Sequence, residues 1–314
     1  MKIVFMGTPD FAEESLKAVY NAGYEILGVV TNPDRPKGRG MKLTASPVKE
    51  FAIEKNLKIY QPVKIRKNEE FIEEIKKLNP DVICVVAYGK ILPKEILEIP
   101  KLGCINVHGS LLPKYRGAAP IQWAVINGDK KTGVTTMYMD EGMDTGDMIY
   151  KEEVEILEDE TTGELWDKLS EVGGELLVKT LKSIEEGKAP REKQSDDFSI
   201  APMLDKKMAQ IDWKNQTAEQ IKNLVRGLNP IMGAYTHLNN KKIKFWKVDI
   251  INNQEDLSQK PNGTIIKADQ KEGLFIKTKK GILKVIEIQG ENAKRMSIQD
   301  YLRGNNLNIN EVFE

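Results

Sequence analysis

The sequence predicts an α/β protein in two parts: a Rossmann-like, mostly parallel sheet with helices on both faces, followed by a small OB-like β-barrel domain. Three observations predict it. Short apolar runs alternate with helical patterns through the first half of the chain. A polar segment that contains two prolines then interrupts this alternation. Short strand-like runs separated by turn residues follow, as is typical of a small barrel.

The first part contains six apolar or β-branched runs of strand length. The expected strands are residues 2–6, 24–31, 81–86, 103–108, 133–139 and 148–154. Apolar residues at helical spacing predict helices at residues 11–22, 47–55, 69–78, 93–99 and 160–186, the last with Thr161 or Thr162 as its N-cap. This alternation implies right-handed βαβ units on a parallel sheet.

The second part follows a linker expected at residues 190–206, so that residues 1–189 form a catalytic domain and residues 207–314 a C-terminal domain. Residues 217–228 have a helical pattern. Strand-like runs come next, at residues 234–238, 242–252, 263–267, 273–278 and 281–289, with turn signals between them. An oligonucleotide-binding barrel is one fold that fits this pattern.

The formal net charge of zero hides an asymmetry between the two parts. Residues 1–205 carry 28 Lys and Arg against 35 Asp and Glu, whereas residues 206–314 carry 19 against 12. A basic C-terminal part suggests a polyanionic partner, and a lysine-rich surface kept for solubility is the equally favoured alternative.

The composition also bears on the cellular compartment. No apolar run reaches about 18 residues, so we expect no membrane-spanning helix and no membrane partner. The two cysteines, Cys84 and Cys104, lie in apolar runs and are expected to be buried thiols of a cytoplasmic protein.

One expected strand ends in two polar side chains. Asn106 and His108 alternate with Val107, so they project to the same face just before Gly109 ends the strand. Ligand sites of open parallel sheets form beyond the carboxyl ends of strands. An amide that donates to an oxyanion and an imidazole that moves protons suit acyl transfer. The alternative, a polar pair that only holds a loop, is less favoured at this position.

The loop after this strand, residues 110–120, is restrained by two prolines and contains Gly117. Leu111 and Leu112 could wall a flat aromatic ligand, although an ordinary strand-to-helix connection has the same composition. Ser110 lies beside His108, but no Gly-x-Ser-x-Gly elbow surrounds it, so a serine hydrolase is disfavoured.

The turn between the last two strands of the sheet is rich in carboxylates. Asp140, Asp144 or Asp147 could pair with a protonated His108, and spacing alone does not choose among them. Solvated turn carboxylates are the more common case. The turn lacks the spacing of an EF-hand, and no metal is expected.

A second loop, residues 31–46, is long for a strand-to-helix connection and is basic. It carries Arg35, Lys37, Arg39 and Lys42, with Lys49 just beyond it. The loop could contact a phosphate backbone, and a solvated charged loop is an equally favoured alternative. The first loop lacks the Gly-x-Gly-x-x-Gly pattern, which disfavours dinucleotide binding.

Together these segments resemble the 10-formyltetrahydrofolate-dependent formyltransferases. The resemblance rests on Asn106-Val107-His108, Ser110-Leu111-Leu112-Pro113, Arg116-Gly117 and Met143-Asp144-Thr145-Gly146, in this order and spacing. It implies that Asn106, His108 and Asp144 are catalytic. It also implies that Ser110, Leu111, Leu112 and Pro113 bind the folate, that 10-formyltetrahydrofolate donates the formyl group, and that no metal is required.

Other segments resemble the branch of the family whose acceptor is initiator methionyl-tRNA. They are Gly7-Thr8-Pro9-Asp10-Phe11, Pro33-Asp34-Arg35-Pro36-x-Gly38-Arg39-Gly40, Ser46-Pro47-Val48-Lys49 and Arg116-Gly117-Ala118-Ala119-Pro120-Ile121-Gln122. This resemblance implies that the basic loop with Arg35, Lys37, Arg39 and Lys42 contacts the acceptor end of the tRNA, and that the basic barrel holds the acceptor arm. A small amine such as a sugar nucleotide is the alternative acceptor. Nothing in the sequence demands an oligomer, so we expect a monomer.

Overall fold

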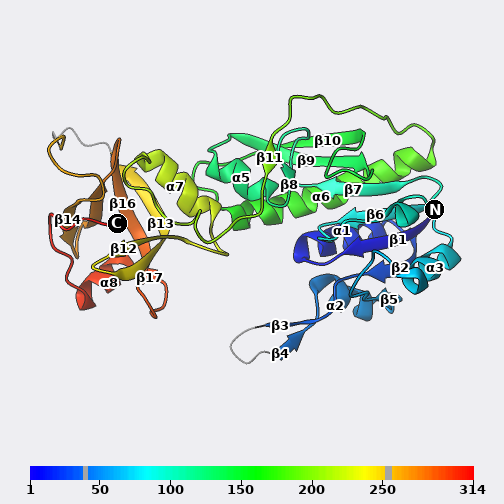
Figure 1. Cartoon of the computed structure of the whole chain (residues 1–314), viewed down its shortest axis with the longest axis horizontal. Coiled ribbons are helices and arrows are strands. Elements are labelled where there is room, and N and C mark those ends of the chain that lie inside the picture. Colours follow the sequence, from blue (N-terminus) through cyan, green and yellow to red (C-terminus); the bar gives the residue numbers. More distant parts are fainter. Residues whose placement is uncertain (38–41, 252–256) are drawn as a thin grey trace. The chain divides into compact units, whose positions relative to one another are not determined.

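Figure 1 shows a computed structural model of the chain, which describes residues 1–37, 42–251 and 257–314. It contains two compact units. The sheet unit comprises Met1–Pro120, Lys131–Glu155 and Trp166–Pro202, and the barrel unit comprises Ile121–Lys130, Ile156–Leu165 and Met203–Glu314. Two short segments that precede residue 189 therefore group with the C-terminal part of the chain. The domain limits expected from the sequence, at residues 189 and 207, stay a prediction.

The sheet unit is built on a seven-stranded sheet with the order β10-β9-β7-β6-β1-β2-β5. Its strands are β1 (Lys2–Gly7), β2 (Glu25–Val30), β5 (Ile59–Tyr60), β6 (Val82–Val86), β7 (Cys104–His108), β9 (Lys131–Tyr138) and β10 (Met148–Glu155). The five strands from β5 to β7 run parallel, while β9 pairs antiparallel with both β7 and β10. The predicted mostly parallel sheet is confirmed.

One face of this sheet is covered by two helices, α3 (Glu69–Leu78) and α4 (Lys94–Leu97). Val4 and Met6 of β1 cluster there with Phe71 and Ile75 of α3 and with Ile96 of α4. The helix α3 begins where the Asn68 side chain accepts a hydrogen bond from the backbone of the first turn.

The opposite face packs against α1 (Asp10–Asn21) and α6 (Thr162–Glu185). A Cβ at Gly173 of α6 would lie 3.2 Å from Val107 of β7, and one at Gly174 would lie 3.1 Å from Ala18 of α1. These two glycines therefore let α6 approach both β7 and α1 closely. Two further helices precede α6 in the chain: α2 (Pro47–Glu54) belongs to the sheet unit, and α5 (Pro120–Ile126) groups mostly with the barrel unit.

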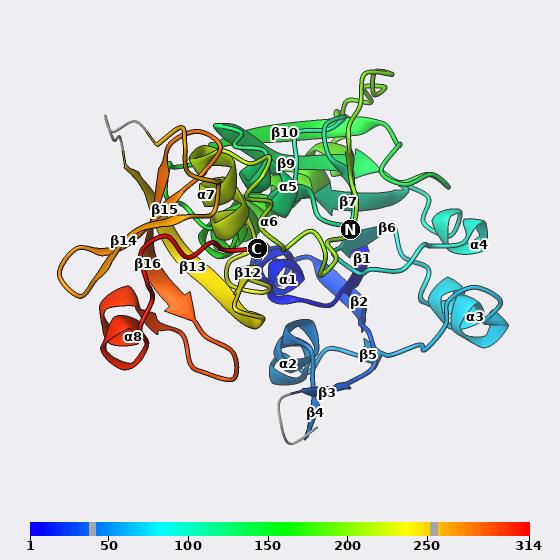
Figure 2. The same ribbon diagram turned by 60° about the vertical axis from the view of Figure 1, so that its left-hand side comes forward.

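Two short strand pairs were not expected from the sequence. Strands β3 (Arg35–Lys37) and β4 (Lys42–Thr44) pair antiparallel within the basic loop. Figures 1 and 2 show them extending beyond α2, away from the body of the sheet. Strands β8 (Arg116–Gly117) and β11 (Ile200–Ala201) pair in parallel and tie the segment after α6 to the loop after β7.

The barrel unit contains a sheet with the order β12-β13-β16-β15-β14, with β17 beside β16. Its elements are α7 (Ala218–Gly227), β12 (Ala234–Leu238), β13 (Lys241–Ile251), β14 (Ile265–Asp269), β15 (Gly273–Lys277), β16 (Ile282–Gln289), β17 (Met296–Ser297) and α8 (Ile298–Gly304). The last residues of the chain join its two edges: Val312 pairs with Thr264 next to β14, and Glu314 exchanges backbone hydrogen bonds with His237 of β12. The C-terminal segment thus pairs with both edge strands, β12 and β14, and closes the sheet.

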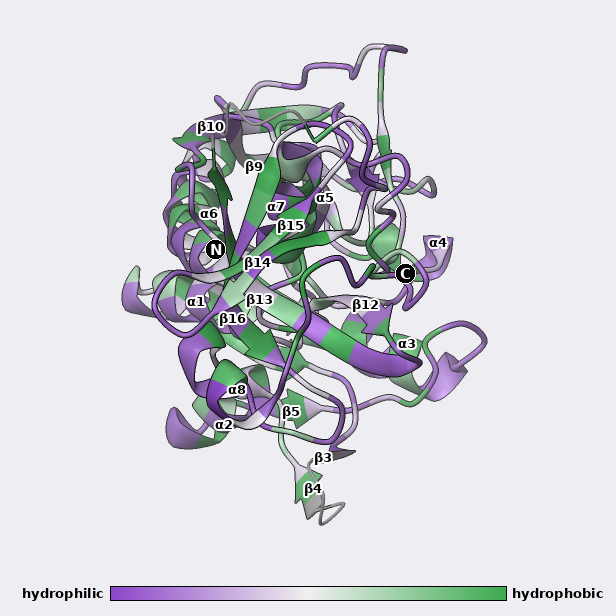
Figure 3. Ribbon diagram, turned by 90° about the vertical axis from the view of Figure 1, so that its left-hand side faces the viewer, coloured by the Kyte–Doolittle hydropathy of each residue, from purple (hydrophilic) through white to green (hydrophobic). Residues whose placement is uncertain are grey.

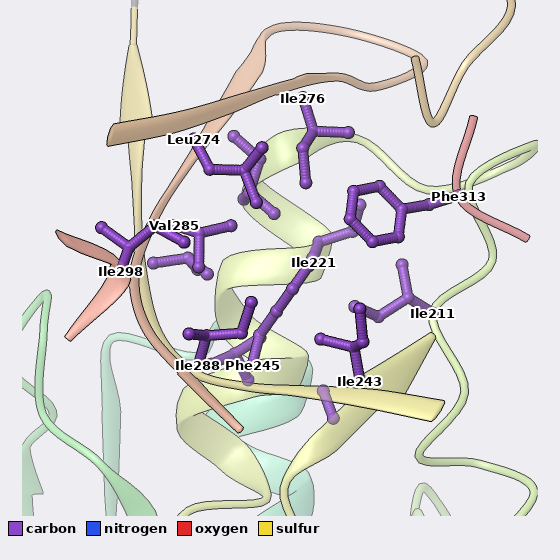
Figure 4. Close-up of a cluster of buried hydrophobic side chains, with 14 of the residues drawn as sticks. Ile211, Ile221, Ile243, Phe245, Leu274, Ile276, Val285, Ile288, Ile298 and Phe313 are labelled. Atoms are coloured by element: carbon purple, nitrogen blue, oxygen red, sulfur yellow. The ribbon is translucent and has the colours of Figure 1, made fainter. Parts of the chain in front are cut away.

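The interior of the barrel is apolar. Side chains from α7, the strands and the C-terminal segment meet there, including Ile221, Phe245 and Phe313 (Figure 4). Apolar and polar residues alternate along β13, and Figure 3 shows this alternation as bands of colour. The helix α7 begins with a capping box in which Thr217 and Gln220 satisfy each other's backbone N–H groups.

Candidate active site

The side chains of Asn106 and His108 lie at the carboxyl end of β7. Val107 between them faces α6, so alternation along the strand directs both polar side chains to the other face of the sheet. They are 9% and 6% exposed. Within the described residues the Asn106 amide has no side-chain hydrogen bond, which leaves its NH₂ group available to a substrate.

His108 contacts two other segments of the sheet unit. Its Nε2 lies 2.8 Å from the backbone oxygen of Tyr115. Because a carbonyl oxygen only accepts, Nε2 carries the proton in this arrangement. The other ring nitrogen, Nδ1, lies 3.7 Å from Oδ2 of Asp144, a contact that becomes an ion pair when the imidazole is protonated. That separation is longer than a hydrogen bond, so the two side chains are close but not directly hydrogen-bonded.

The three candidate acids of the turn have different surroundings. Asp140 accepts a hydrogen bond from the Thr145 hydroxyl at 2.7 Å and so stabilises its own turn. Asp147 pairs with Arg191, with 3.3 Å between Oδ2 and Nε. Only Asp144 among the three is placed against the imidazole. The geometry therefore distinguishes the acid that spacing in the sequence could not.

Asp144 is held from both its side chain and its backbone. Its Oδ2 accepts a hydrogen bond of 2.8 Å from the backbone N–H of Gly117. Asp144 has φ of 54°, a left-handed conformation that is uncommon for residues other than glycine. Gly117 has φ of 120°, and a Cβ there would lie 2.7 Å from the backbone oxygen of Ala201. Glycine at position 117 is therefore required for its N–H to reach the carboxylate.

The loop after β7 uses its own polar groups to hold its shape. The Ser110 hydroxyl donates to the backbone oxygen of Lys114 at 2.6 Å. Thr135 of β9 donates to the Ser110 carbonyl at 2.7 Å and accepts from the Leu112 N–H at 3.1 Å. The hydroxyl of Ser110 is therefore engaged within the loop, which explains why this serine is not a free nucleophile.

The four residues expected to bind the folate are not equally accessible. Leu112 is 1% exposed and clusters with Met137 and Met148. Leu111 and Pro113 are partly exposed. These two side chains, together with backbone groups of the loop, are the parts that could contact a ligand.

The basic loop is anchored at its base. Asp34 accepts hydrogen bonds from Lys49 Nζ at 2.7 and 2.9 Å and from Gln61 Nε2 at 2.9 Å. The Lys49 ammonium, followed by the Gln61 amide, lowers the pKa of the Asp34 carboxyl. Lys49 is thus used inside the protein, whereas Arg35 is exposed.

The other three basic residues of that loop are described less fully. Lys37 and Lys42 face each other in the β3–β4 pair, and their side chains lie outside the described part of the structure. Arg39 lies outside the described residues altogether.

A polar cluster joins the carboxyl ends of β1, β2 and β6 beside the site. Asn32 Nδ2 donates to the Thr8 hydroxyl and to the Tyr88 carbonyl, both at 3.0 Å. Asn32 Oδ1 and the Tyr88 hydroxyl are buried and have no hydrogen-bond partner among the described residues. Burial raises the pKa of Tyr88 above its usual range, so its hydroxyl stays a donor. Buried polar atoms of this kind are commonly satisfied by a ligand or water.

Several residues that shape the site were not expected from the sequence. They are Tyr115, whose carbonyl meets His108, Thr135, Gln194 and Ser199. The last two lie in the segment that was expected to be a linker. Their positions carry no periodic signal, because both act through loops that come together only in the folded sheet unit.

The sequence also raised expectations about the two cysteines, a metal site and membrane-spanning helices. Cys84 and Cys104 are buried and unpaired, and burial raises the pKa of the Cys104 thiol to about 12. Across the described ranges, no group of three His, Cys, Asp or Glu side chains could hold a metal ion. None of the helices described there is long and apolar enough to cross a bilayer.

Comparison with solved structures supports the fold. An N-formyltransferase from Helicobacter canadensis, in complex with folinic acid and dTDP-3-aminofucose, matches with a TM-score of 0.66 over 91% of this chain and 99% of that chain, at 19% identity. HypX from Aquifex aeolicus in complex with tetrahydrofolic acid matches with a TM-score of 0.61 over 97% of this chain and 47% of that chain, at 15% identity.

Comparison of sequences supports a narrower assignment. Residues 1–181 match the family described as formyl transferase, and residues 203–306 match the formyl transferase C-terminal domain. Methionyl-tRNA formyltransferase from Clostridioides difficile is 58% identical over 98% of both chains. The enzyme from Caldanaerobacter subterraneus is 51% identical over the same shares. The chain therefore belongs to the formyl transferase family and, within it, to the methionyl-tRNA formyltransferases.

Proposed function

We propose that this chain transfers the formyl group of 10-formyltetrahydrofolate to the free amino group of methionyl-initiator tRNA, which gives N-formylmethionyl-tRNA for translation initiation. The high identity to methionyl-tRNA formyltransferases over nearly the whole chain carries this proposal. The placement of Asn106, His108 and Asp144 around the end of β7 supplies the chemistry.

In the reaction, the neutral amine of methionine attacks the formyl carbon, and a new C–N bond forms. The bond between that carbon and N10 of the folate breaks, and the proton lost by the amine is matched by one gained at N10. In the tetrahedral intermediate between these two events, the oxygen of the formyl group carries negative charge. Donors aimed at this oxygen lower the barrier.

Asn106 is well suited to stabilise that oxygen. Its amide makes no hydrogen bond with any described side chain, so it can donate without first breaking a contact. The strand fixes its backbone on both sides, where Val85 and Met137 are its partners. A donor that is already in place needs little reorganisation during the reaction.

His108 and Asp144 are proposed to assist the same step. Because Nε2 donates to the Tyr115 carbonyl, the Nδ1–H is the donor left for the oxyanion. Protonation at Nδ1 also gives His108 a positive charge, so that it forms an ion pair with the Asp144 carboxylate. Nδ1 and Asp144 Oδ2 are 3.7 Å apart, so a water molecule or the amine beside the pair can contact both atoms and mediate proton transfer. No metal is required in this scheme.

We propose that the folate is bound beside the loop after β7 by Ser110, Leu111, Leu112 and Pro113. Leu111 and Pro113 are the partly exposed members, and Ser110 would act by holding the loop. At the neighbouring strand ends, the buried Asn32 Oδ1 and Tyr88 hydroxyl have no hydrogen-bond partner among the described residues, and a bridging water could link them to a heterocycle.

We propose that Arg35, Lys37, Arg39 and Lys42 contact the acceptor end of the tRNA. Exposed cations on a hairpin can meet a phosphate backbone, and Arg35 is exposed. The barrel unit would hold the acceptor arm. On its outer face, Lys242 Nζ lies 3.5 Å from the centre of the Tyr235 ring, which combines a cation with a surface for stacking. The catalytic domain would comprise residues 1–189 and the tRNA-binding domain residues 207–314, in a cytoplasmic monomer.

A formylation assay tests the acceptor. The protein is incubated with 10-formyltetrahydrofolate and either initiator or elongator methionyl-tRNA, and the formylated product is counted. We expect product with the initiator tRNA and far less with the elongator. A sugar-nucleotide amine is included because the enzyme from Helicobacter canadensis was crystallised with dTDP-3-aminofucose. Product from the sugar nucleotide alone would contradict the proposal.

A further inference from the structure

The segment that follows α6 passes along the loops of the candidate active site. Glu192 bridges to Met148 at the start of β10, and β11 pairs with β8. The hydroxyl of Ser199 accepts a hydrogen bond of 2.9 Å from the N–H of Tyr115. A stretch that the sequence suggests is only a linker is therefore fixed to the loop whose carbonyl meets His108.

Gln194 makes three hydrogen bonds from within this segment. Its Nε2 donates to the backbone oxygens of Asp144 at 2.8 Å and of Gly146 at 2.9 Å. Its Oε1 accepts from Arg116 Nε at 2.9 Å. Since guanidinium only donates and carbonyls only accept, these partners determine which way the amide faces. One side chain thus joins the Asp144 turn to the loop after β7.

The Arg116 side chain that orients Gln194 is itself fixed. It is 8% exposed, and its guanidinium carbon lies 4.4 Å from the centre of the Phe198 ring. Phe198 belongs to the same segment as Gln194. Both ends of the Gln194 amide are therefore attached to groups that have little freedom to move.

Asp144 needs such support because of its backbone conformation. A left-handed φ of 54° is unfavourable for a residue with a Cβ, so it persists only where surrounding groups hold it. Gln194 binds the Asp144 backbone oxygen, while Gly117 binds its carboxylate. Without Gln194 the turn could relax, and the carboxylate could leave the imidazole.

We infer that Gln194 is a positioning residue for formyl transfer, which holds the Asp144 turn in the conformation that places the carboxylate beside His108. This inference rests on the proposed catalytic role of Asp144. It makes Gln194 a part of the site, although this residue lies outside the segments that carry the reacting groups.

The first test compares Gln194→Ala with Gln194→Glu. Glutamate keeps the length of the side chain and an acceptor for Arg116, but it has no N–H for the two carbonyls. We expect each variant to lower kcat by about 10- to 100-fold, because misplacing a catalytic group by about 1 Å can cost this much. KM for folate and for tRNA should stay within about twofold, since Gln194 acts on the turn and not on either substrate. Wild-type kcat in Gln194→Glu would overturn the inference.

The second test asks whether Gln194 acts through Asp144. In an Asp144→Ala background, adding Gln194→Ala should lower kcat by less than about twofold, because residues that act as a unit give non-additive effects. A full further loss in the double variant would show that Gln194 acts elsewhere, and would overturn the inference. If Asp144→Ala alone kept normal kcat, the proposed role of Asp144 would fail instead, so the two failures are distinguishable.

Two controls separate positioning from folding. Ser195→Ala changes the neighbouring exposed residue, whose hydroxyl contacts, within the described residues, only the Asp197 backbone oxygen at 3.4 Å, and it should leave kcat unchanged. Gln194→Met preserves the length of the side chain without polar atoms and is measured alongside Gln194→Ala, so that the result does not depend on one variant folding. Melting temperatures are recorded for all variants. A loss of kcat that followed melting temperature alone would contradict a positioning role.

Discussion

The end of β7 in the sheet unit and the interior of the barrel unit are both buried, yet they are stabilised in different ways. Around β7, polar side chains contact backbone groups of separate loops: His108 meets the Tyr115 carbonyl, and Asp144 accepts from the Gly117 N–H. The barrel interior is formed by apolar side chains such as Phe245 and Ile221. Its buried hydroxyl at Thr236 is satisfied by Trp213 and by the backbone of Glu314.

This difference indicates what each region can tolerate. A cluster of hydrogen-bonded catalytic groups loses activity when one of its distances or angles changes, even if the protein still folds. When side-chain volume is removed from an apolar core, the free energy of unfolding falls in proportion to that volume. Such a core makes no directional hydrogen bond to a substrate. Catalysis should therefore be sensitive to single changes at the strand end, and folding should be sensitive to single changes in the barrel.

The largest effect is expected for Phe245→Ala in the barrel. Phe245 is 0% exposed, and its ring centre lies 5.8 Å from that of Phe313. Truncation of a buried phenylalanine costs about 3–5 kcal/mol. The free energy of unfolding, measured with urea, should fall by this amount. Ile231→Ala, at a side chain that is 78% exposed, should change it by less than about 0.5 kcal/mol. If the free energy of unfolding fell equally in both variants, burial of Phe245 would not explain its contribution to stability.

The next effect is expected for Asn106→Ala at the end of β7. The loss of one oxyanion donor lowers turnover by about 10²–10³-fold, which is roughly 2.7–4 kcal/mol. The free energy of unfolding should change far less than in Phe245→Ala, because the Asn106 amide has no hydrogen bond within the described chain to lose. Steady-state formylation at saturating tRNA measures kcat.

Asn306→Ala serves as the control for that variant, because this residue is exposed after α8. Its kcat should equal that of the wild type. Near-normal turnover in Asn106→Ala would remove Asn106 from the catalytic group and would leave His108 as the remaining candidate on β7.

The sequence was informative where structure is local. Alternation along 103–108 predicted that Asn106 and His108 share a face, because a strand has a period of two. Apolar runs and helical spacing predicted the elements of the parallel sheet, and turn residues predicted the short strands of the barrel. These patterns depend on neighbours within a few positions.

The parts that the sequence could not predict depend on distant residues. Spacing left three acids open, and Asp144 is distinguished only because the turn after β9 returns to the end of β7. The segment with Gln194 looked like a polar linker, since nothing near it in sequence shows that its amide meets Asp144 and Arg116. Closure of the barrel by Val312 and Glu314 was likewise not evident, because the C-terminus has no strand-like run.

The smallest effect is expected for Arg35→Ala on the basic hairpin. This variant compares an exposed surface charge with the buried groups at the end of β7 and in the barrel. An exposed charge pair contributes about 0.2–1 kcal/mol, so KM for tRNA should rise by no more than about fivefold, while KM for folate stays unchanged. The dependence of tRNA affinity on salt should weaken by the equivalent of about one phosphate contact. Lys77→Ala, on the exposed side of α3, is the matched control and should alter neither quantity. If Arg35→Ala raised both KM values equally, the hairpin would act on the site as a whole rather than on the tRNA. The proposal that buried groups catalyse the reaction while surface charges bind the tRNA would then be wrong.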